Sequence, residues 1–372
     1  MKPLEIYIHI PFCAKKCNYC DFLSGPAPKE ERRAYVESLC RRIRSCGNLA
    51  KAYRVISIFV GGGTPSILEG EQMGQIFAAA RQAFFIDENA EITVEVNPGT
   101  VTEEKLKMYR ETGVNRLSIG LQSASDEELK ILGRIHSFRD FLETYRMAKE
   151  EGFGNINVDL ISAVPGQTRE SWAQTLERTA ALCPEHISAY SLIIEEGTPF
   201  YEIYSSENSG SRKKGEGNPP LPDEDEERQM YQDTKDILAQ YGYERYEISN
   251  YARKGYECRH NLGYWNRTEY LGIGTGASSF MEHKRWVQDE KPHELSMSEE
   301  MEEYMFLGLR KTKGVSAKRF EEEFTAPIEE IYGAVINDMI SKGLMVRNDD
   351  FIMLTDRGTD VSNYVMSMFL LD

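Results

Sequence analysis

Six short β-rich runs alternate with helical patterns over the first 200 residues, and no other feature limits the possible folds as much. These runs are residues 5–10, 55–60, 91–96, 116–121, 156–161 and 186–192. Most are nearly continuous apolar runs, as strands buried on both faces of a sheet are. Alternating β and α segments predict an α/β fold with a parallel sheet and outer helices. Six units suit a partial (β/α)6 barrel or an open sheet, and periodicity alone does not choose between them.

The rest of the chain divides into three parts after this first region of residues 1–204. Residues 205–228 are rich in Ser, Gly, Pro and charged residues, and this composition predicts a flexible linker. Residues 229–290 start with a helical pattern and continue with Tyr, Trp, Asn and Gly in weak periodicity, which indicates an irregular extension of the barrel. Residues 291–372 indicate three helices, a hairpin and a last helix, the order of a smaller α+β winged-helix-like domain.

One helix of this last domain has an apolar stripe, made of Ile328, Ile331, Tyr332, Val335, Ile336, Met339 and Ile340. The helix that a DNA-binding winged helix places in the groove would here carry Glu329, Glu330 and Asp338, which repel phosphates. The whole chain has 44 Lys and Arg against 60 Asp and Glu, a formal net charge of −16. We therefore interpret the domain as a packing module and expect no nucleic-acid partner.

Composition also bears on the cellular compartment. No apolar run approaches the roughly 20 residues that a membrane helix needs. The N-terminal sequence lacks the apolar length and the small-residue cleavage site of a signal peptide, so we expect a cytoplasmic protein without an integral membrane segment. The seven cysteines are an odd number, which favours metal binding or redox chemistry over a disulfide framework.

Three of these cysteines, Cys13, Cys17 and Cys20, follow the first predicted strand with the spacing C-x3-C-x2-C. A structural zinc site normally takes four protein ligands, so His9 or a remote residue would have to complete it. A redox pair would use Cys17 and Cys20 and leave Cys13 without a role. A 4Fe–4S cluster held by three thiolates leaves one iron open to a small molecule, which explains three cysteines without a fourth.

This spacing, with the aromatic Tyr19 before the last cysteine, resembles the radical S-adenosyl-L-methionine (SAM) superfamily. The resemblance implies a partial (β/α)6 radical-SAM barrel. It also implies that the amino and carboxylate groups of SAM bind the open iron, and that an electron from the cluster cleaves SAM to a 5′-deoxyadenosyl radical. The cofactors would then supply the difficult chemistry, while the protein positions and shields them.

In such a barrel the cofactors lie at the C-terminal ends of the strands, and suitable polar groups follow the predicted strands here. The glycines of GGGTP, residues 61–65, allow close approach to backbone N–H and C=O groups. Glu95 and Gln122 end the third and fourth strands, and Asp159 lies in the fifth. Arg134 offers a cation for a carboxylate. Each could be a cap or a satisfied buried polar group, but together they favour a cofactor site.

Further matches narrow the resemblance to the HemN/HemW group of this superfamily. They cover nearly the whole chain, with the stretches YIHIPFC, CNYCDF, GGGTPS, EVNPGT, GLQS, LGRIHS, PGQT, YEISNYA and HNLGYW. By motif matching, the resemblance implies that Cys13, Cys17 and Cys20 hold the cluster. It also implies SAM contacts from a set of residues near the strand ends: Tyr7, Tyr19, Gly62, Gly63, Thr64, Glu95, Gln122, Arg134, Asp159 and, on weaker motifs, Ile193 and Ser278.

Within this group, two features favour the haem chaperones of the HemW branch over the oxygen-independent coproporphyrinogen III oxidases. The oxidase motif has a further cysteine where Phe22 stands here, and the oxidase has an N-terminal extension that we do not expect in this chain. HNLGYW, residues 260–265, matches the H-N-x-x-Y-W motif associated with haem binding in HemW. The resemblance implies binding of the cluster, SAM and haem, and delivery of haem to haem-accepting proteins. Oxidase activity, or radical methylation by a HemN-like protein, is the alternative.

The haem ligand has two candidates in this stretch, His260 and Cys258, because imidazole and thiolate both bind haem iron. Two residues depart from the pattern of the group. Ser162 stands where a tyrosine is common, and Ser278 stands where a histidine is common. These departures bear on the lining of the substrate pocket and leave the cluster motif unchanged.

Overall fold

A long sheet forms the larger part of the molecule in the computed structural model, which describes residues 1–49, 51–205 and 218–371. In these residues the sheet has twelve strands, in the order β12-β11-β10-β9-β1-β2-β3-β4-β5-β6-β8-β7. The run from β9 through β1 to β6 is parallel, and the pairs outside it are antiparallel. The central strands are β1 (Lys2–Ile10), β2 (Tyr53–Gly62), β3 (Ile86–Val96), β4 (Arg116–Gln122), β5 (Ile156–Ser162) and β6 (His186–Ser191). The flanking strands are β7 (Glu244–Arg245), β8 (Asn250–Ala252), β9 (Tyr270–Ile273), β10 (Ser278–Met281), β11 (Lys284–Val287) and β12 (His293–Glu294).

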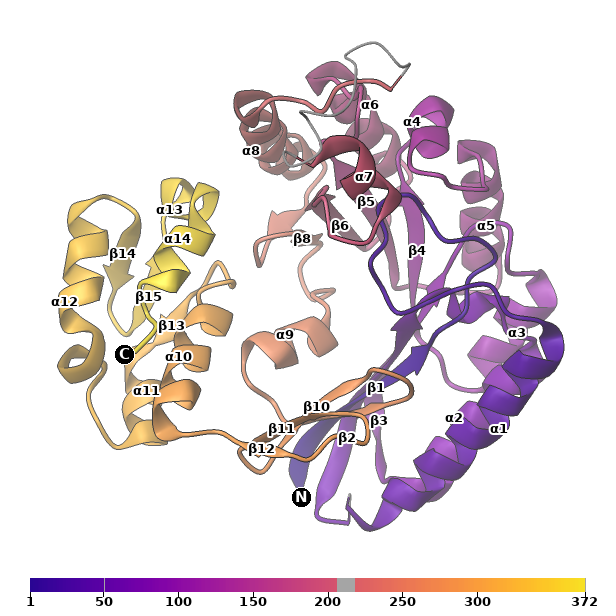
Figure 1. Cartoon of the computed structure of the whole chain (residues 1–372), viewed down its shortest axis with the longest axis horizontal. Coiled ribbons are helices and arrows are strands. Elements are labelled where there is room, and N and C mark those ends of the chain that lie inside the picture. Colours follow the sequence, from indigo (N-terminus) through magenta and orange to yellow (C-terminus); the bar gives the residue numbers. More distant parts are fainter. Residues whose placement is uncertain (50, 206–217, 372) are drawn as a thin grey trace.

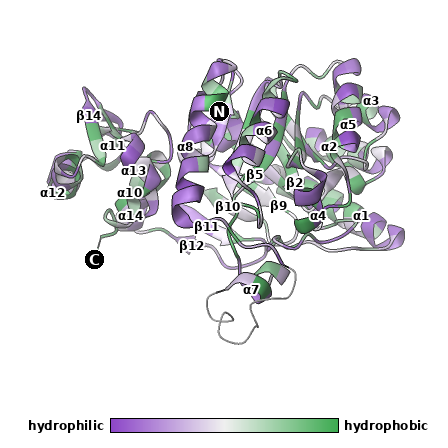
Figure 2. Cartoon of the chain, turned by 90° about the horizontal axis from the view of Figure 1, so that it is seen from above, coloured by the Kyte–Doolittle hydropathy of each residue, from purple (hydrophilic) through white to green (hydrophobic). Residues whose placement is uncertain are grey.

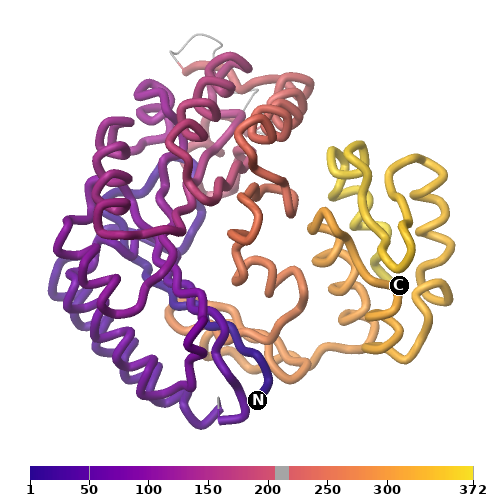
Figure 3. Tube along the Cα trace, turned by 180° about the vertical axis from the view of Figure 1, so that it is seen from behind, coloured from indigo at the N-terminus to yellow at the C-terminus, as the bar shows by residue number. Residues whose placement is uncertain are grey.

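The six predicted strands are therefore confirmed, and so is the parallel sheet with helices outside (Figures 1 and 3). The helices of this part are α1 (Lys29–Ser45), α2 (Gly70–Ala83), α3 (Glu103–Glu111), α4 (Asp126–Ile131), α5 (Phe138–Glu150), α6 (Arg169–Ala180), α7 (Pro199–Tyr204) and α8 (Glu224–Gln240), with 3-10 turns at Cys46–Asn48 and Pro65–Ile67. Thr102 begins α3 as predicted, because its side-chain oxygen accepts a hydrogen bond from the Lys105 N–H. The strands curve into a partial barrel.

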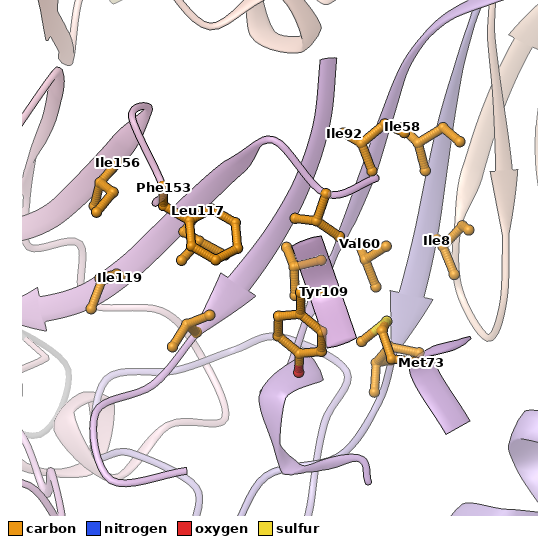
Figure 4. Close-up of a cluster of buried hydrophobic side chains, with 14 of the residues drawn as sticks. Ile8, Ile58, Val60, Met73, Ile92, Tyr109, Leu117, Ile119, Phe153 and Ile156 are labelled. Atoms are coloured by element: carbon orange, nitrogen blue, oxygen red, sulfur yellow. The ribbon is translucent and has the colours of Figure 1, made fainter. Parts of the chain in front are cut away.

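The core of this barrel lies between the sheet and its outer helices. Ile8 in β1, Val60 in β2 and Ile92 in β3 are at most 6% exposed, and they pack near Met73 of α2 and Tyr109 of α3 (Figure 4). Each buried side chain of this kind contributes about 1.5–3 kcal/mol to folding. Hydrophilic residues cover the outer helices, most clearly α8 (Figure 2). The attachment of the helices therefore rests on their apolar faces, as their sequences predicted.

The linker predicted over residues 205–228 is too long at its C-terminal end. Residues 224–228 form the first turns of α8, because the Asp223 side chain accepts a hydrogen bond from the Glu226 N–H and Glu226 bonds back. The cluster of acids that we interpreted as linker composition stabilises a helix N-terminus. Residues 206–217 of the predicted linker lie outside the described residues.

The C-terminal part is a separate small unit with its own core (Figures 1 and 3). Its elements are α10 (Met297–Gly308), β13 (Val315–Ser316), α11 (Ala317–Phe324), α12 (Ile328–Ser341), β14 (Met345–Asn348), β15 (Phe351–Leu354), α13 (Asp356–Asp360) and α14 (Ser362–Ser367). This order agrees with the predicted winged-helix-like domain. The stripe of α12 is narrower than predicted, since Ile331 and Ile340 are 37% and 36% exposed, whereas Tyr332 and Ile336 are buried.

Backbone hydrogen bonds hold this unit against the barrel. The Ile248 N–H donates to the Arg310 carbonyl at 3.0 Å, and the Thr312 N–H donates to the Tyr246 carbonyl at 3.0 Å. Helix α9 (Arg259–Trp265) lies between the two units (Figure 1). Among the described helices, none has the length and apolar character needed to cross a membrane.

Candidate cofactor and ligand site

One cavity of about 560 Å³ opens on the inner side of the barrel. Its lining comes from β1, the loop after β1, the ends of β2 and β3, helix α9, the β10 region and α10. It includes five of the residues singled out from the sequence, Tyr7, Gly62, Glu95, His260 and Ser278. We call it the barrel cavity. Four of the predicted SAM contacts and the predicted haem motif therefore share one space.

The three cysteines lie on the loop after β1, at the edge of this space. The Cys13 N–H donates to the Gly25 carbonyl at 2.9 Å, which closes the loop at its base. Cys13 is buried, and Cys17 and Cys20 are half-buried free thiols. Among the described residues, no three His, Cys, Asp or Glu side chains are placed to hold one metal ion. The described side chains around these cysteines do not form a four-ligand zinc site. A 4Fe–4S cluster takes each thiolate on a different iron, so it requires sulfurs that are separated from one another.

Donors from the barrel point at two of the three sulfurs. The Thr64 hydroxyl lies 3.5 Å from the Cys13 Sγ, and the Arg134 Nη1 lies 3.6 Å from the Cys17 Sγ. Hydrogen bonds to the sulfurs are one means by which a protein tunes the potential of an iron–sulfur cluster. The donor set therefore fits a cluster held by Cys13, Cys17 and Cys20.

The glycines at the end of β2 bring the backbone close to this loop. Gly62 has φ +112°, and a Cβ atom there would lie 2.4 Å from the ring of His9. A Cβ atom on Gly63 would lie 2.6 Å from the Phe12 carbonyl oxygen and 3.0 Å from the Cys13 Sγ. Glycine is required at both positions, for the backbone conformation at Gly62 and for the close approach at Gly63.

Two carboxyl groups lie near the end of β3 and in the middle of β5. Burial, and secondarily the charge of Asp159, raise the pKa of Glu95 to about 8, although Glu95 accepts a hydrogen bond from the Gly62 N–H at 3.1 Å. Burial also raises the pKa of Asp159, which accepts hydrogen bonds from Ser118 at 2.9 Å and Asn157 at 2.8 Å. Glu95 is thus mostly protonated and neutral at neutral pH, and a neighbouring cation would favour its ionised form.

Arg134 sits beside the cysteine loop and not in the lining of the barrel cavity. Its Nη2 donates to the Asn97 side chain at 2.7 Å and to the Gly120 carbonyl at 2.9 Å. Tyr19 packs beside the buried side chains of Leu132 and Ile161. The remaining predicted contacts, Gln122, Asp159 and Ile193, also lie outside that lining, and Ile193 is 66% exposed.

On the opposite wall, His260 of α9 is 2% exposed and held on both ring nitrogens. Its Nδ1 lies 2.8 Å from the Ser57 hydroxyl and its Nε2 lies 3.2 Å from the Tyr264 hydroxyl, while its ring stacks on Phe59 at 5.2 Å. Burial, and secondarily the positive charge of Arg116, lower the pKa of His260 to about 3. The imidazole is therefore neutral, the form in which histidine binds a metal.

Two buried carboxyl groups support α9 from the sheet. Glu91 accepts hydrogen bonds from the N–H groups of Arg259 and His260, each at 3.1 Å. Glu5 is fully buried, and its carboxyl lies 3.9 Å from the His260 Nδ1. Burial raises the pKa of Glu5 to about 9. A Cβ atom on Gly263 would lie 2.0 Å from a Glu5 oxygen, so helix and strand approach closely.

The second candidate ligand, Cys258, is placed differently. Its side chain is fully buried, does not line the barrel cavity, and lies 3.5 Å from the Glu91 carboxyl. Burial raises the pKa of Cys258 to about 12, so the thiol keeps its proton. A thiol in this position does not present a thiolate to the cavity.

Several lining residues were missed in the sequence, among them His9, Phe22, Phe59 and Arg285. His9 could have been found from the period of two in β1, where it shares a face with Tyr7 and alternates with the buried Ile8. It joins the loop to the strand, since its ring nitrogens lie 3.0 Å from the Tyr7 hydroxyl and 3.0 Å from the Leu23 carbonyl. The others have no local signal, because they enter the cavity from separate parts of the chain.

Comparison with known proteins agrees with this geometry. Residues 7–179 match the radical SAM superfamily model, and residues 295–361 match the HemN C-terminal domain. The chain is 36% identical to the haem chaperone HemW of Lactococcus lactis, over 100% of this chain and 98% of that protein. It is 35% identical to HemW of Bacillus subtilis and 33% identical to HemW of Escherichia coli, again over at least 98% of each chain.

The chain belongs to the HemW family. As a member of the radical SAM superfamily, it uses a 4Fe–4S cluster and SAM. Among solved structures, the coproporphyrinogen III oxidase HemN of Escherichia coli is 23% identical with a TM-score of 0.84, covering 99% of this chain and 90% of the oxidase. At this identity the likeness shows the fold, and it confirms the predicted partial barrel with its C-terminal domain.

Proposed function

We propose that this HemW-family protein is a cytoplasmic haem chaperone that holds haem in the barrel cavity and delivers it to haem-accepting proteins. The observation that carries the proposal is His260, a neutral imidazole on the wall of a cavity that also touches the cysteine loop. Aromatic rings surround it, and such rings pack well on a flat macrocycle.

The iron ligand in this proposal is the His260 Nε2, which lies near the Tyr264 hydroxyl. Haem binding would replace that hydrogen bond, while Ser57 keeps the ring oriented through Nδ1. Cys258 does not take this role, because its protonated thiol lies away from the cavity.

The cluster is assigned to Cys13, Cys17 and Cys20, and it supplies the electron that cleaves SAM when both are bound. The residues that we assign to SAM are those implied by the family resemblance: Tyr7, Tyr19, Gly62, Gly63, Thr64, Glu95, Gln122, Arg134, Asp159, Ile193 and Ser278. Three features support the assignment. The Gly62–Gly63 backbone offers polar groups, Glu95 suits the SAM ammonium, and Arg134 suits a carboxylate.

The test is a haem titration followed at the Soret band, with wild type, His260→Ala and Cys258→Ala. We expect His260→Ala to weaken haem binding at least tenfold and to shift the band, because the iron loses its protein ligand. Cys258→Ala is the matched control and should leave the haem affinity and the position of the Soret band unchanged. Wild-type binding and spectra in His260→Ala would remove His260 as the ligand.

Delivery is tested separately, by mixing haem-loaded protein with an apo-haem protein and following transfer of the Soret signal. The alternative function is tested on the same anaerobic preparation, loaded with cluster and SAM and supplied with coproporphyrinogen III. We expect transfer without protoporphyrinogen formation. Sustained conversion of coproporphyrinogen would place the protein with the oxidases, and methylation of a substrate would place it with HemN-like methyltransferases.

A further inference from the structure

A second cavity, of about 450 Å³, lies between the end of α9 and the C-terminal domain. We call it the interdomain cavity. Its lining includes Trp265 and Asn266 from the end of α9, together with Lys311 and Lys313 from the segment between α10 and α11 and Arg319 from the first turn of α11. It has no place in the function proposed above. With Arg267, which also lines it, four cations gather at one cavity of a chain whose net charge is −16.

Two of these cations lack an anionic partner. In the described part of the chain, neither Lys311 nor Lys313 is ion-paired with a carboxylate. The Lys311 Nζ donates to the Asn266 side chain, and the Lys313 Nζ lies 4.4 Å from the centre of the Phe351 ring. Burial, and secondarily the charges of Arg319 and Lys313, lower the pKa of Lys311 to about 8. The cluster is therefore under mutual repulsion, which a bound anion would relieve.

A neighbouring arginine, in contrast to these lysines, is fully ion-paired. Arg267, in the same lining, contacts three carboxylates: Glu300 at 2.7 Å, Glu303 at 3.6 Å and Glu323. Arg319 has a weaker ion pair than Arg267. Its Nε lies 3.8 Å from a Glu323 oxygen, and its Nη2 donates a hydrogen bond to the Asn266 carbonyl at 2.8 Å. Carboxylates are available nearby, yet they do not reach the two lysines.

The two cavities adjoin each other. Trp265 lines both of them, and the successive α10 residues Leu307 and Gly308 line the barrel cavity and the interdomain cavity respectively. The Trp265 Nε1 is buried and has no hydrogen-bond partner in the described residues. An indole donor without an acceptor thus stands on the wall that separates the two spaces.

Among the described residues that line the barrel cavity, no lysine or arginine is free of an ion pair. The arginine in its lining, Arg285, forms a two-pronged ion pair with Glu303, at 2.5 Å and 2.9 Å, and donates to the Tyr270 hydroxyl at 2.7 Å. Haem carries two propionate groups, which remain charged at neutral pH. A haem in the barrel cavity would therefore lack a partner there for these charges.

We propose that the interdomain cavity is a carboxylate site that takes the propionates of the haem bound next to it. The inference rests on the proposed function, and it adds Lys311 and Lys313 as the residues that recognise the acidic edge of the ligand. The loop that carries them packs closely against the C-terminal domain. Gly314 has φ +69°, and a Cβ atom there would lie 2.0 Å from the Ile352 carbonyl oxygen, so the loop packs directly on the small sheet.

The test compares haem with its dimethyl ester, which keeps the macrocycle and iron but loses both charges. We expect the wild type to bind haem about tenfold more tightly than the ester, since a charge-assisted contact is worth at least this factor. In Lys311→Met/Lys313→Met the two ligands should bind equally. Lys318→Met, on the exposed side of α11, is the matched control and should keep the preference.

The outcomes separate this inference from the proposed function. No binding of either ligand by the wild type would overturn the haem chaperone itself. Equal binding of haem and ester by the wild type would overturn the carboxylate site and leave the chaperone in place. If succinate protects the wild type from thermal unfolding while haem and ester bind equally, the cavity takes a small organic acid instead, and the inference about propionates is wrong. The wild-type comparison needs no variant to fold.

Discussion

The two walls of the barrel cavity are built in opposite ways. On one wall, Phe22 and Leu23 are 61% and 56% exposed, and they belong to the irregular loop that also carries the half-buried Cys17 and Cys20. On the other wall, His260 is 2% exposed and bonded on both ring nitrogens. The loop is joined to the barrel by hydrogen bonds at Phe12, Asn18 and Leu23, whereas α9 is held by buried carboxyl groups.

This difference suggests that the protein itself orders one wall, whereas the bound cofactor orders the other. The α9 wall is organised by the protein, because His260 and the N–H groups that begin α9 already have partners in the described structure. The cysteine wall has three thiols and exposed apolar side chains, so we expect its final shape to depend on the cluster. The predictions below test whether the two walls are independent in this way.

The largest effect is expected from Cys13→Ala/Cys17→Ala/Cys20→Ala. Anaerobic reconstitution should give about four irons and four sulfides per wild-type chain and none in the variant. Amide exchange should rise over the loop after β1 and stay unchanged over α9. Increased exchange at α9 would show that the two walls form one unit.

The second largest effect is expected from Gly62→Ala, which changes only the side of the cavity next to the cysteine loop. A methyl group at Gly62 would meet the His9 ring and would occupy an unfavourable backbone conformation. We expect SAM affinity to fall by about a hundredfold, on the basis of strain of roughly 1–3 kcal/mol together with displacement of His9. Isothermal titration with reconstituted protein measures this. Gly25→Ala is the matched control, because its added Cβ meets open space.

Glu91→Gln tests the wall that the protein organises. The Glu91 carboxyl accepts two backbone hydrogen bonds at the start of α9, one on each oxygen. An amide has only one oxygen, so it keeps only part of this acceptor capacity. We expect a loss of about 1–3 kcal/mol in stability by urea unfolding, with raised amide exchange at α9. Cluster content should not change. Loss of the cluster in this variant would contradict independent walls.

The smallest effect is a proton released on SAM binding. Because the pKa of Glu95 is raised to about 8, the carboxyl is mostly protonated at pH 7, and a nearby SAM ammonium would favour its ionised form. SAM affinity should therefore rise with pH up to about 8 and then level off. Calorimetry in two buffers of different ionisation enthalpy should show release of less than one proton, which Glu95→Gln removes.

Sequence reasoning predicted regular elements and local motifs well. The buried apolar runs predicted the six strands, and Thr102 predicted the start of α3. The acidic start of α8 was mistaken for linker, because a helix cap and a polar linker share their composition. Ile331 shows the limit of periodicity, which indicates a face but not how far the neighbouring elements extend over it.

The interior of the barrel was less predictable. Glu91 and Glu95 both lie in β3, and only the fold shows that Glu91 supports α9 while Glu95 contacts Gly62. The interdomain cavity had no sequence signal at all. Its lysines and Trp265 are about 50 residues apart and meet only because backbone hydrogen bonds join residues 246–248 to residues 310–312.

The close approach of Gly263 to Glu5 has an evolutionary consequence. A Cβ atom on Gly263 would overlap the Glu5 carboxyl, so the two positions share a fixed volume. We expect them to co-vary among homologues: a chain with alanine or serine at position 263 should carry a shorter residue at position 5. Lineages that keep the long acid should keep the glycine, and a single substitution at either position should be rare without its compensating partner.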